Sequence, residues 1–135
     1  MALCPTEVAM RLVSSLLAAL SLVSFVQIAA AVDAPSAEQA MFEKMLTATR
    51  DNNFQAFIAS ADEQMQRMPQ AEFDKATMQF APLLKAGYHS AYFGSFKGQG
   101  FTVHYWKLEF AGEPDWLAKM GVSNGTVKGF LITRP

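Results

Sequence analysis

Residues 101–110 read Phe-Thr-Val-His-Tyr-Trp-Lys-Leu-Glu-Phe, and their side chains alternate between two sets. One set is largely apolar and consists of Thr102, His104, Trp106, Leu108 and Phe110. The other set is expected to face solvent and consists of Val103, Tyr105, Lys107 and Glu109. A period of two residues is typical of a β-strand that buries one face and leaves the other toward solvent. The stretch therefore predicts the clearest strand of the chain.

Three further strands are predicted around it, at about 88–97, 115–122 and 126–133, because runs of similar alternation are separated by glycine-containing turns. Asn124-Gly125 is a strong signal for a two-residue hairpin, since both residue types tolerate a positive φ. The four strands are expected to be antiparallel.

Upstream of Gly87 the apolar residues recur at helical spacing instead. Helices are expected to begin at Ser36 and Asn52, each with a glutamine at capping-box distance, and again after Pro69. Pro82 is expected to bend or break the last helix near its end. Helices followed by an antiparallel meander predict an α+β domain, with N-terminal helices packed on one face of a four-stranded sheet.

The N-terminal part has the layout of a secretory signal peptide. Arg11 precedes a long apolar run over 12–31, which closes on Ala29, Ala30 and Ala31. Cleavage after Ala31 would leave a short linker over 32–35 and a single domain over 36–135, exported to a bacterial periplasm or the medium. A membrane anchor is the alternative, since about 20 apolar residues can span a bilayer. Met10 is an alternative start to Met1.

Charge and cysteine content restrict the possible partners. The chain has 11 Lys and Arg, 12 Asp and Glu, and scattered single lysines, so no basic stripe for nucleic acid or anionic lipid is expected. Cys4 is the only cysteine and precedes the apolar run, so disulfides are not expected in the domain. No membrane contact is expected once the signal peptide is removed.

Several stretches give a resemblance to a known superfamily. They are Leu84-Lys85-Ala86-Gly87-Tyr88, His104-Tyr105-Trp106-Lys107-Leu108 and the closing hairpin over 124–132. With the helix-to-sheet order, residues 36–135 resemble the nuclear transport factor 2-like (cystatin-like) superfamily, in particular its small exported bacterial domains of unknown function. The resemblance implies a curved sheet wrapped round helices as a cone. That superfamily includes isomerases, cyclases and non-enzymatic binding or dimerisation modules, so it does not select one activity.

Aromatic side chains are the best candidates for a ligand site. A slot for a small apolar or planar molecule in the cone would be lined by Tyr88, Tyr92, His104, Trp106 and Trp116. The same spacing is typical of ordinary strand core. In an isomerase- or cyclase-like alternative, His104 would carry the proton and Tyr92 would donate a hydrogen bond. The face that carries His104 and Trp106 has no carboxylate, which favours binding over catalysis.

Metal and cofactor binding are not expected. His89 and His104 stand fifteen positions apart on different strands, and no cysteine or carboxylate accompanies them at ligand spacing. Glu109 and Asp115 flank a turn, where they are interpreted as solvated charges rather than a catalytic pair.

The sequence therefore predicts an exported binding or dimerisation module. Val103, Tyr105 and Leu117 would leave an apolar patch on the outer face of the sheet, which predicts a homodimer through that face. The alternatives are the enzyme that uses His104 and a structural or inhibitory partner of another exported protein.

Overall fold

The computed structural model describes residues 32–135, and the predicted signal peptide over 1–31 lies outside the described residues. Four helices precede four strands along the chain. The helices are α1 (Ser36–Arg50), α2 (Phe54–Ile58), α3 (Glu63–Gln66) and α4 (Gln70–Ala86). The strands are β1 (His89–Lys97), β2 (Thr102–Glu109), β3 (Trp116–Ser123) and β4 (Thr126–Thr133). The predicted α+β class is confirmed.

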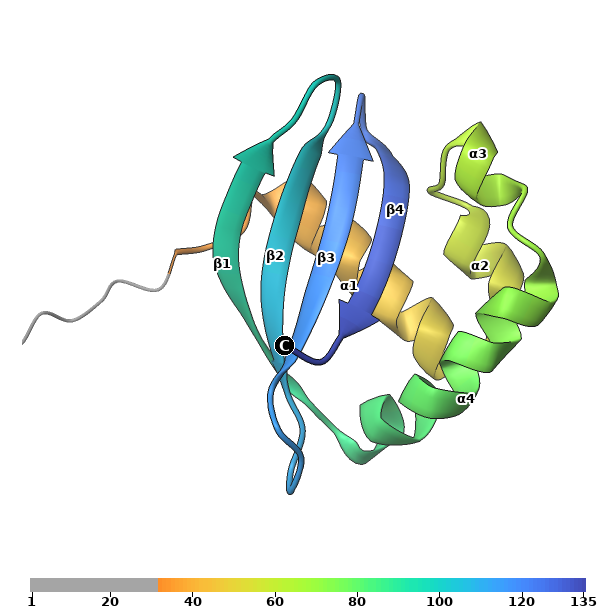
Figure 1. The fold of residues 1–135 in the computed structure, drawn as a ribbon, viewed down its shortest axis with the longest axis vertical. Helices are drawn as coiled ribbons and strands as arrows, with labels where there is room; N and C mark the ends of the chain where they lie inside the picture. Colours follow the sequence, from red (N-terminus) through yellow and green to blue (C-terminus); the bar gives the residue numbers. More distant parts are fainter. Residues whose placement is uncertain (1–31) are drawn as a thin grey trace, which may run out of the picture.

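The strands form one antiparallel sheet in the order β1-β2-β3-β4, so every strand pairs with its neighbour in sequence (Figure 1). The β3–β4 hairpin turns at Asn124 and Gly125, whose φ angles are 49° and 74°. The left-handed turn predicted from this dipeptide is therefore confirmed. The register of β1 against β2 shifts between Tyr92 and Gly94, which leaves Phe93 in a bulge.

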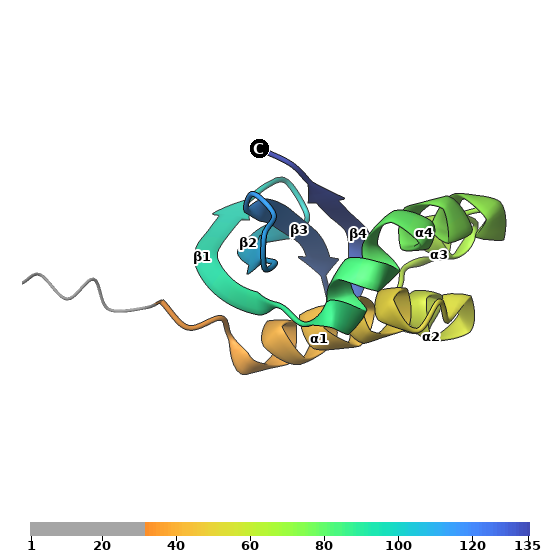
Figure 2. The same cartoon turned by 90° about the horizontal axis from the view of Figure 1, so that it is seen from below.

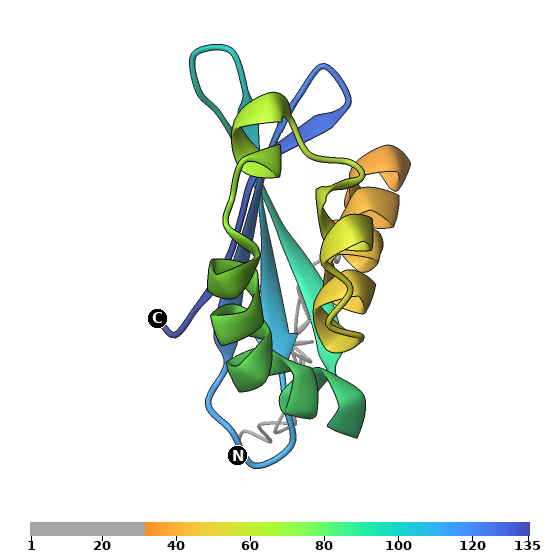
Figure 3. The same cartoon turned by 90° about the vertical axis from the view of Figure 1, so that its right-hand side faces the viewer.

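Helix α1 crosses the back of the sheet, whereas α2, α3 and α4 lie beside the β4 edge (Figures 1 and 2). The view from that edge places these three helices nearest the viewer (Figure 3). A short link joins them to the sheet, because the Asp62 amide donates to the Val127 carbonyl and the Val127 amide donates to the Ser60 carbonyl. Helix α1 packs on the sheet through a largely apolar face that includes Phe42, Met45 and Leu46.

The inner face of the sheet, toward α1, holds the side chains that the alternation predicts to be buried. On β2 and β3 these are His104, Trp106, Leu108, Trp116, Ala118, Met120 and Val122. Their neighbours in sequence are only half-buried on the opposite face. A core of this kind is stabilised mainly by removing apolar surface from water, at about 25 cal/mol per Å².

Several helix boundaries differ from the predictions. Helix α1 begins at Ser36 after Pro35 and has no side-chain cap, so the expected Ser36 capping box is wrong. The caps of the short helices are Asn53 for α2 and Asp62 for α3, and each side chain accepts a hydrogen bond from a backbone amide. Pro82 lies inside α4, and the helix continues past it to Ala86. The expected break at Pro82 is therefore wrong, and the helix ends at Gly87 with φ 106°.

Candidate functional site

Three of the five predicted ligand residues lie together on the inner face of β1 and β2. The Tyr92 hydroxyl and His104 Nδ1 are 2.9 Å apart, within hydrogen-bond distance. The Tyr92 and Trp106 ring centroids are 5.2 Å apart, and those of His104 and Trp106 are 5.9 Å apart. The register of the sheet explains this grouping. Tyr92 of β1 is paired with Trp106 of β2, and both side chains lie on the inner face.

Trp106 is a core residue and does not line an open slot. It is fully buried, and its ring lies parallel to the Phe42 ring of α1 at 4.0 Å between centroids. Its indole Nε1–H donates to Gln39 Oε1 at 2.9 Å, and Gln39 Nε2 donates in turn to Glu43 Oε1. The apolar face of the indole is therefore packed against Phe42, and its N–H has a hydrogen-bond acceptor. Trp106 therefore agrees with the alternative interpretation, in which the aromatic residues are ordinary strand core.

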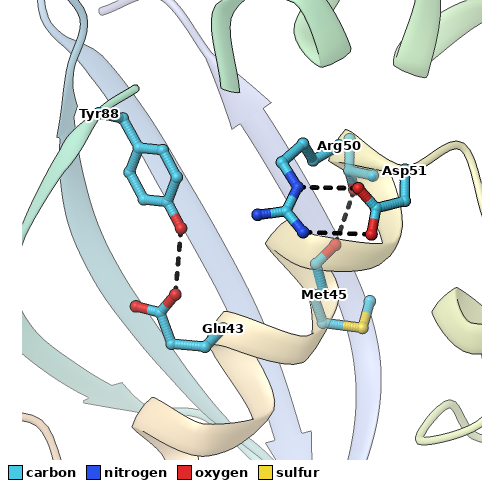
Figure 4. Close-up of polar contacts among 6 residues, drawn as sticks. Glu43, Met45, Arg50, Asp51 and Tyr88 are labelled. Carbon is cyan, nitrogen blue, oxygen red and sulfur yellow. Dashed lines mark hydrogen bonds and ion pairs between the residues drawn. The ribbon is translucent and has the colours of Figure 1, made fainter. Parts of the chain in front are cut away.

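Tyr88 lies at the start of the same edge and contacts the same carboxylate. Its hydroxyl donates to Glu43 Oε2 at 3.1 Å, so α1 and the segment before β1 are joined by a charge-assisted hydrogen bond (Figure 4). Burial, together with the charge of Glu43 and this hydrogen bond, raises the pKa of Tyr88 to about 12. The same view shows the exposed Arg50–Asp51 pair at the end of α1.

His104 is 4% exposed. Burial lowers the pKa of its imidazole, and the charge of Glu38 on α1 opposes that shift. A neutral imidazole next to a tyrosine hydroxyl has the composition of an acid–base pair. Its burial nevertheless keeps most of the ring away from any molecule that approaches from outside.

Trp116 stands apart from this group. It contacts Phe80 of α4 edge-on at 5.2 Å between centroids, and the Arg134 guanidinium lies 4.6 Å from its ring centroid. Its Nε1–H is buried and has no hydrogen-bond partner among residues 32–135. The five predicted residues therefore do not form one site.

A different cavity lies between the helices and β4. We call it the β4 slot; it is open to one side and has a volume of about 190 Å³. It is lined by Thr49, Phe57, Met68, Glu72, Phe73, Ala76, Thr77, Phe80, Phe130, Leu131 and Ile132. These residues come from α1, α2, α4 and β4, and from the turn before α4. Side chains that are far apart in the sequence, from Thr49 to Ile132, thus line one cavity.

Aromatic packing holds the walls of the β4 slot in place. Phe73 of α4 lies 4.7 Å from Phe57 of α2, and Phe57 meets Phe130 of β4 edge-on at 6.0 Å between centroids. Phe130 in turn lies 6.2 Å from Phe42 in the main core. The slot is therefore continuous with the core and is built on helices and a strand rather than on loops.

The polar groups of the β4 slot are largely used within the domain. The Thr49 hydroxyl donates to the Met45 carbonyl at 2.8 Å, and the Thr77 hydroxyl donates to Asn52 Oδ1 at 2.7 Å. Glu72 is exposed at the rim. The lining side chains among residues 32–135 therefore offer mainly apolar surface, and the two threonine hydroxyls among them already donate within the domain.

The remaining candidate charges form ordinary surface pairs. Lys107 contacts both Glu109 and Asp115, so the two carboxylates that flank the β2–β3 turn share one ammonium group. Among residues 32–135, no three His, Cys, Asp or Glu side chains gather closely enough to hold a metal ion. Over the same residues, none of the helices has the length and apolar character needed to cross a bilayer.

Sequence reasoning identified the phenylalanines of α2 and α4 as apolar helix faces but did not identify the cavity between them. The available signal was the density of phenylalanine at helical spacing in Phe57, Phe73 and Phe80. Their convergence with Phe130 depends on how α4 lies beside β4, which no local pattern reports.

Comparisons with known proteins give no relative for this chain. No family model matches it, and neither the curated proteins nor the solved structures contain a match.

Proposed function

We propose that this domain binds a small, uncharged, apolar or aromatic molecule in the β4 slot. The observation that carries the proposal is an apolar cavity of about 190 Å³ with phenylalanines from two helices and a strand around it. Concave, mostly apolar and largely preformed cavities are the usual sites for small molecules. The proposed ligand position is therefore beside β4, and not among the five residues that the sequence suggested.

The size of the slot limits the ligand. A buried apolar cavity of about 150 Å³ is enough to hold benzene, whereas sites for drug-sized molecules measure about 300–1,000 Å³. At about 190 Å³, the slot has room for one or two fused rings or a short alkyl chain. Larger ligands would have to project past Ala76 and Glu72 at the rim.

The polarity of the slot limits the ligand further. The hydroxyls of Thr49 and Thr77 already donate within the domain, and a ligand carboxylate would meet no cation among the lining residues. The rim carries Glu72, which would repel an anion. A neutral apolar molecule is the class that these surroundings favour.

Binding is favoured over catalysis. The Tyr92–His104 pair would be the acid–base group of an enzyme, but neither residue lines the β4 slot, and His104 is almost fully buried. The role of partner to another exported protein is the remaining alternative, and it predicts that no small molecule saturates the slot.

The signal-peptide pattern over 12–31 supports the proposal that the domain works outside the cytoplasm. The helix-to-sheet order supports a place in the nuclear transport factor 2-like superfamily, whose members include enzymes and non-enzymatic binding or dimerisation modules.

Titration calorimetry with indole tests the proposed site. Ala76 is an exposed residue of α4 that lines the slot, and Ala76→Phe would place a ring in its opening. Ala71→Phe is the matched control, because Ala71 is exposed on the same helix and does not line the slot. We expect Ala76→Phe to weaken indole binding at least about tenfold and the control to leave it unchanged. Equal binding by both variants, or no binding by the native domain, would contradict the proposal.

A further inference from the structure

We propose that the free edge of β4 binds the ligand of the β4 slot through backbone hydrogen bonds. The ligand is then a neutral aromatic molecule that carries a hydrogen-bond donor and an acceptor side by side on one edge of its rings. This inference rests on the proposed function, because it concerns the same slot. It adds a polar feature of the ligand that the apolar side chains of the slot do not specify.

β4 is an edge strand of the sheet. Among residues 32–135 it pairs with β3, and its other side makes a single bridge, between Val127 and Ala61. Helix α4 lies beside this edge, and none of the described strands covers it (Figures 1 and 3). An edge strand carries a row of backbone N–H and C=O groups that the ladder of the sheet does not use.

The β4 slot passes along this edge. Its lining includes the three consecutive residues Phe130, Leu131 and Ile132. Successive side chains of a strand point to opposite faces of a sheet. Ile132 is buried on the inner face, where it is paired with Ala118, whereas Leu131 is 53% exposed on the outer face, where it is paired with Lys119. A cavity that is lined from both faces passes the edge of the strand, so the backbone of β4 forms part of its wall.

The hydrogen bonds of Val127 show which backbone groups point toward this edge. The Val127 N–H donates to the Ser60 carbonyl, and the Val127 carbonyl accepts from the Asp62 N–H. Both groups of Val127 therefore point away from β3. Val127 is paired with Val122 of β3, so this pair is a non-hydrogen-bonded pair of the β3–β4 ladder.

Hydrogen-bonded and non-hydrogen-bonded pairs alternate along an antiparallel ladder. From Val122, the next non-hydrogen-bonded positions of β3 are Met120 and Ala118, and their partners on β4 are Phe130 and Ile132. The count follows β3, because the irregularity in this ladder places its additional residue on β4. The N–H and C=O groups of Phe130 and Ile132 therefore point away from β3, toward the slot that these residues line.

These groups have no partner in the neighbouring elements. Among residues 32–135, no backbone group outside the sheet bonds Phe130 or Ile132. The threonine hydroxyls of the slot donate to Met45 and Asn52 instead. Ile132 is only 8% exposed. Because more than about 90% of buried backbone polar groups are paired in proteins, this edge favours an occupant that both donates and accepts hydrogen bonds.

The pattern of an edge strand determines the class of ligand. A strand residue presents its N–H and its C=O on the same side, so that a partner can exchange two hydrogen bonds with it. An aromatic ring with an N–H next to a ring nitrogen or a carbonyl oxygen offers the complementary pair. The volume of about 190 Å³ limits the remainder of the molecule to about two fused rings. Phe57, Phe73 and Phe80 provide apolar surroundings for the faces of those rings.

Three bicyclic molecules of nearly equal size test this inference. Indole has a donor and no ring acceptor, 7-azaindole has a ring nitrogen next to the N–H, and benzimidazole is an isomer of 7-azaindole whose ring nitrogen points away from the N–H. In a purely apolar slot, the additional nitrogen loses its water without gaining a partner, so both isomers bind more weakly than indole. At the β4 edge, only 7-azaindole can form two hydrogen bonds with one side of a strand.

Titration calorimetry of the full chain, exported by a bacterial host, measures the three affinities. We expect 7-azaindole to bind at least about five times more tightly than indole and at least about ten times more tightly than benzimidazole. Binding of indole with no preference for 7-azaindole over benzimidazole would overturn the edge contact and leave the apolar slot intact as the proposed function. Absence of binding by all three molecules would overturn both.

Amide NMR locates the contact on the strand. Saturation with 7-azaindole should move the amide proton of Phe130 or Ile132 downfield and slow its exchange with water, because the N–H gains an acceptor. Leu131 is the internal control, since it occupies a hydrogen-bonded position of the ladder and its N–H points toward β3. Unchanged exchange at both Phe130 and Ile132 in the saturated protein would contradict the proposal.

Discussion

The Trp106 indole lies parallel to the Phe42 ring, with 4.0 Å between centroids and 3° between planes. Both side chains are fully buried, so this stack joins α1 to the centre of the sheet. Offset-stacked and edge-to-face aromatic pairs contribute about 0.5–1.5 kcal/mol beyond the area they bury. The inner face of β2 is therefore occupied by protein where the sequence suggested a ligand.

Removal of the Phe42 ring should strongly destabilise the domain. Phe42→Ala deletes a fully buried ring and leaves a cavity against Trp106, so we expect the free energy of unfolding to fall by about 3–5 kcal/mol. Urea unfolding measures this loss. Met78→Ala, at an exposed position of α4, should stay within about 0.5 kcal/mol of the native chain. Similar losses in the two variants would contradict this assignment of the core.

Gln39 should stabilise the domain through Trp106. Gln39→Leu leaves the buried indole N–H without its acceptor, which should cost about 1–3 kcal/mol in unfolding free energy. In a Trp106→Phe background the donor is absent, and the same substitution should cost clearly less. Equal costs in both backgrounds would show that Gln39 acts without the indole.

Acidification should destabilise the native state through His104. Because burial lowers the pKa of His104, the unfolded chain binds this proton near pH 6.5, whereas the folded chain binds it only at lower pH. The stabilising contribution of neutral His104 to the free energy of unfolding is present above pH 6.5, and it is lost as the pH falls through the folded pKa of His104. Urea unfolding between pH 7.5 and 5 should show a smaller decline for His104→Gln than for the native chain. His89→Gln, at the exposed start of β1, is the matched control. An identical decline in all three proteins would contradict the prediction.

Alkaline pH should act through Tyr88 in the opposite direction. The folded pKa of about 12 lies above the ordinary value of 10.0, so the stabilising contribution is complete below pH 10 and is lost as the pH rises toward 12. Ultraviolet titration of the native chain minus Tyr88→Phe isolates this phenol. Its midpoint should fall in Glu43→Gln, which removes the neighbouring negative charge. A native difference curve centred near pH 10 would rule out the Tyr88–Glu43 contact in solution.

The strands were predictable because their information is local. In β2 every second side chain from His104 to Leu108 is buried, and the alternation of residue types states this directly. Asn124 and Gly125 define their turn through backbone preferences that belong to the two residues alone. The fold class follows from these patterns together with the helical spacing upstream.

The contacts of α1 and the β4 slot were not predictable in the same way. Gln39 has the spacing of a capping residue, yet its side chain bonds Trp106, 67 positions away. Phe57, Phe73 and Phe130 meet across three elements, and each has an ordinary core explanation within its own element. The β4 slot therefore depends on how the helices pack against β4. The aromatic strand residues, in contrast, could be singled out from their residue type alone.

The most direct test of the proposed function is an amide and methyl NMR titration of the domain with indole. The account predicts saturable shifts confined to residues around the β4 slot, including Thr77, Phe130 and Ile132, with little change at Tyr92 and His104. Saturable shifts centred on Tyr92 and His104, or no saturable shifts at all, would contradict ligand binding between α4 and β4.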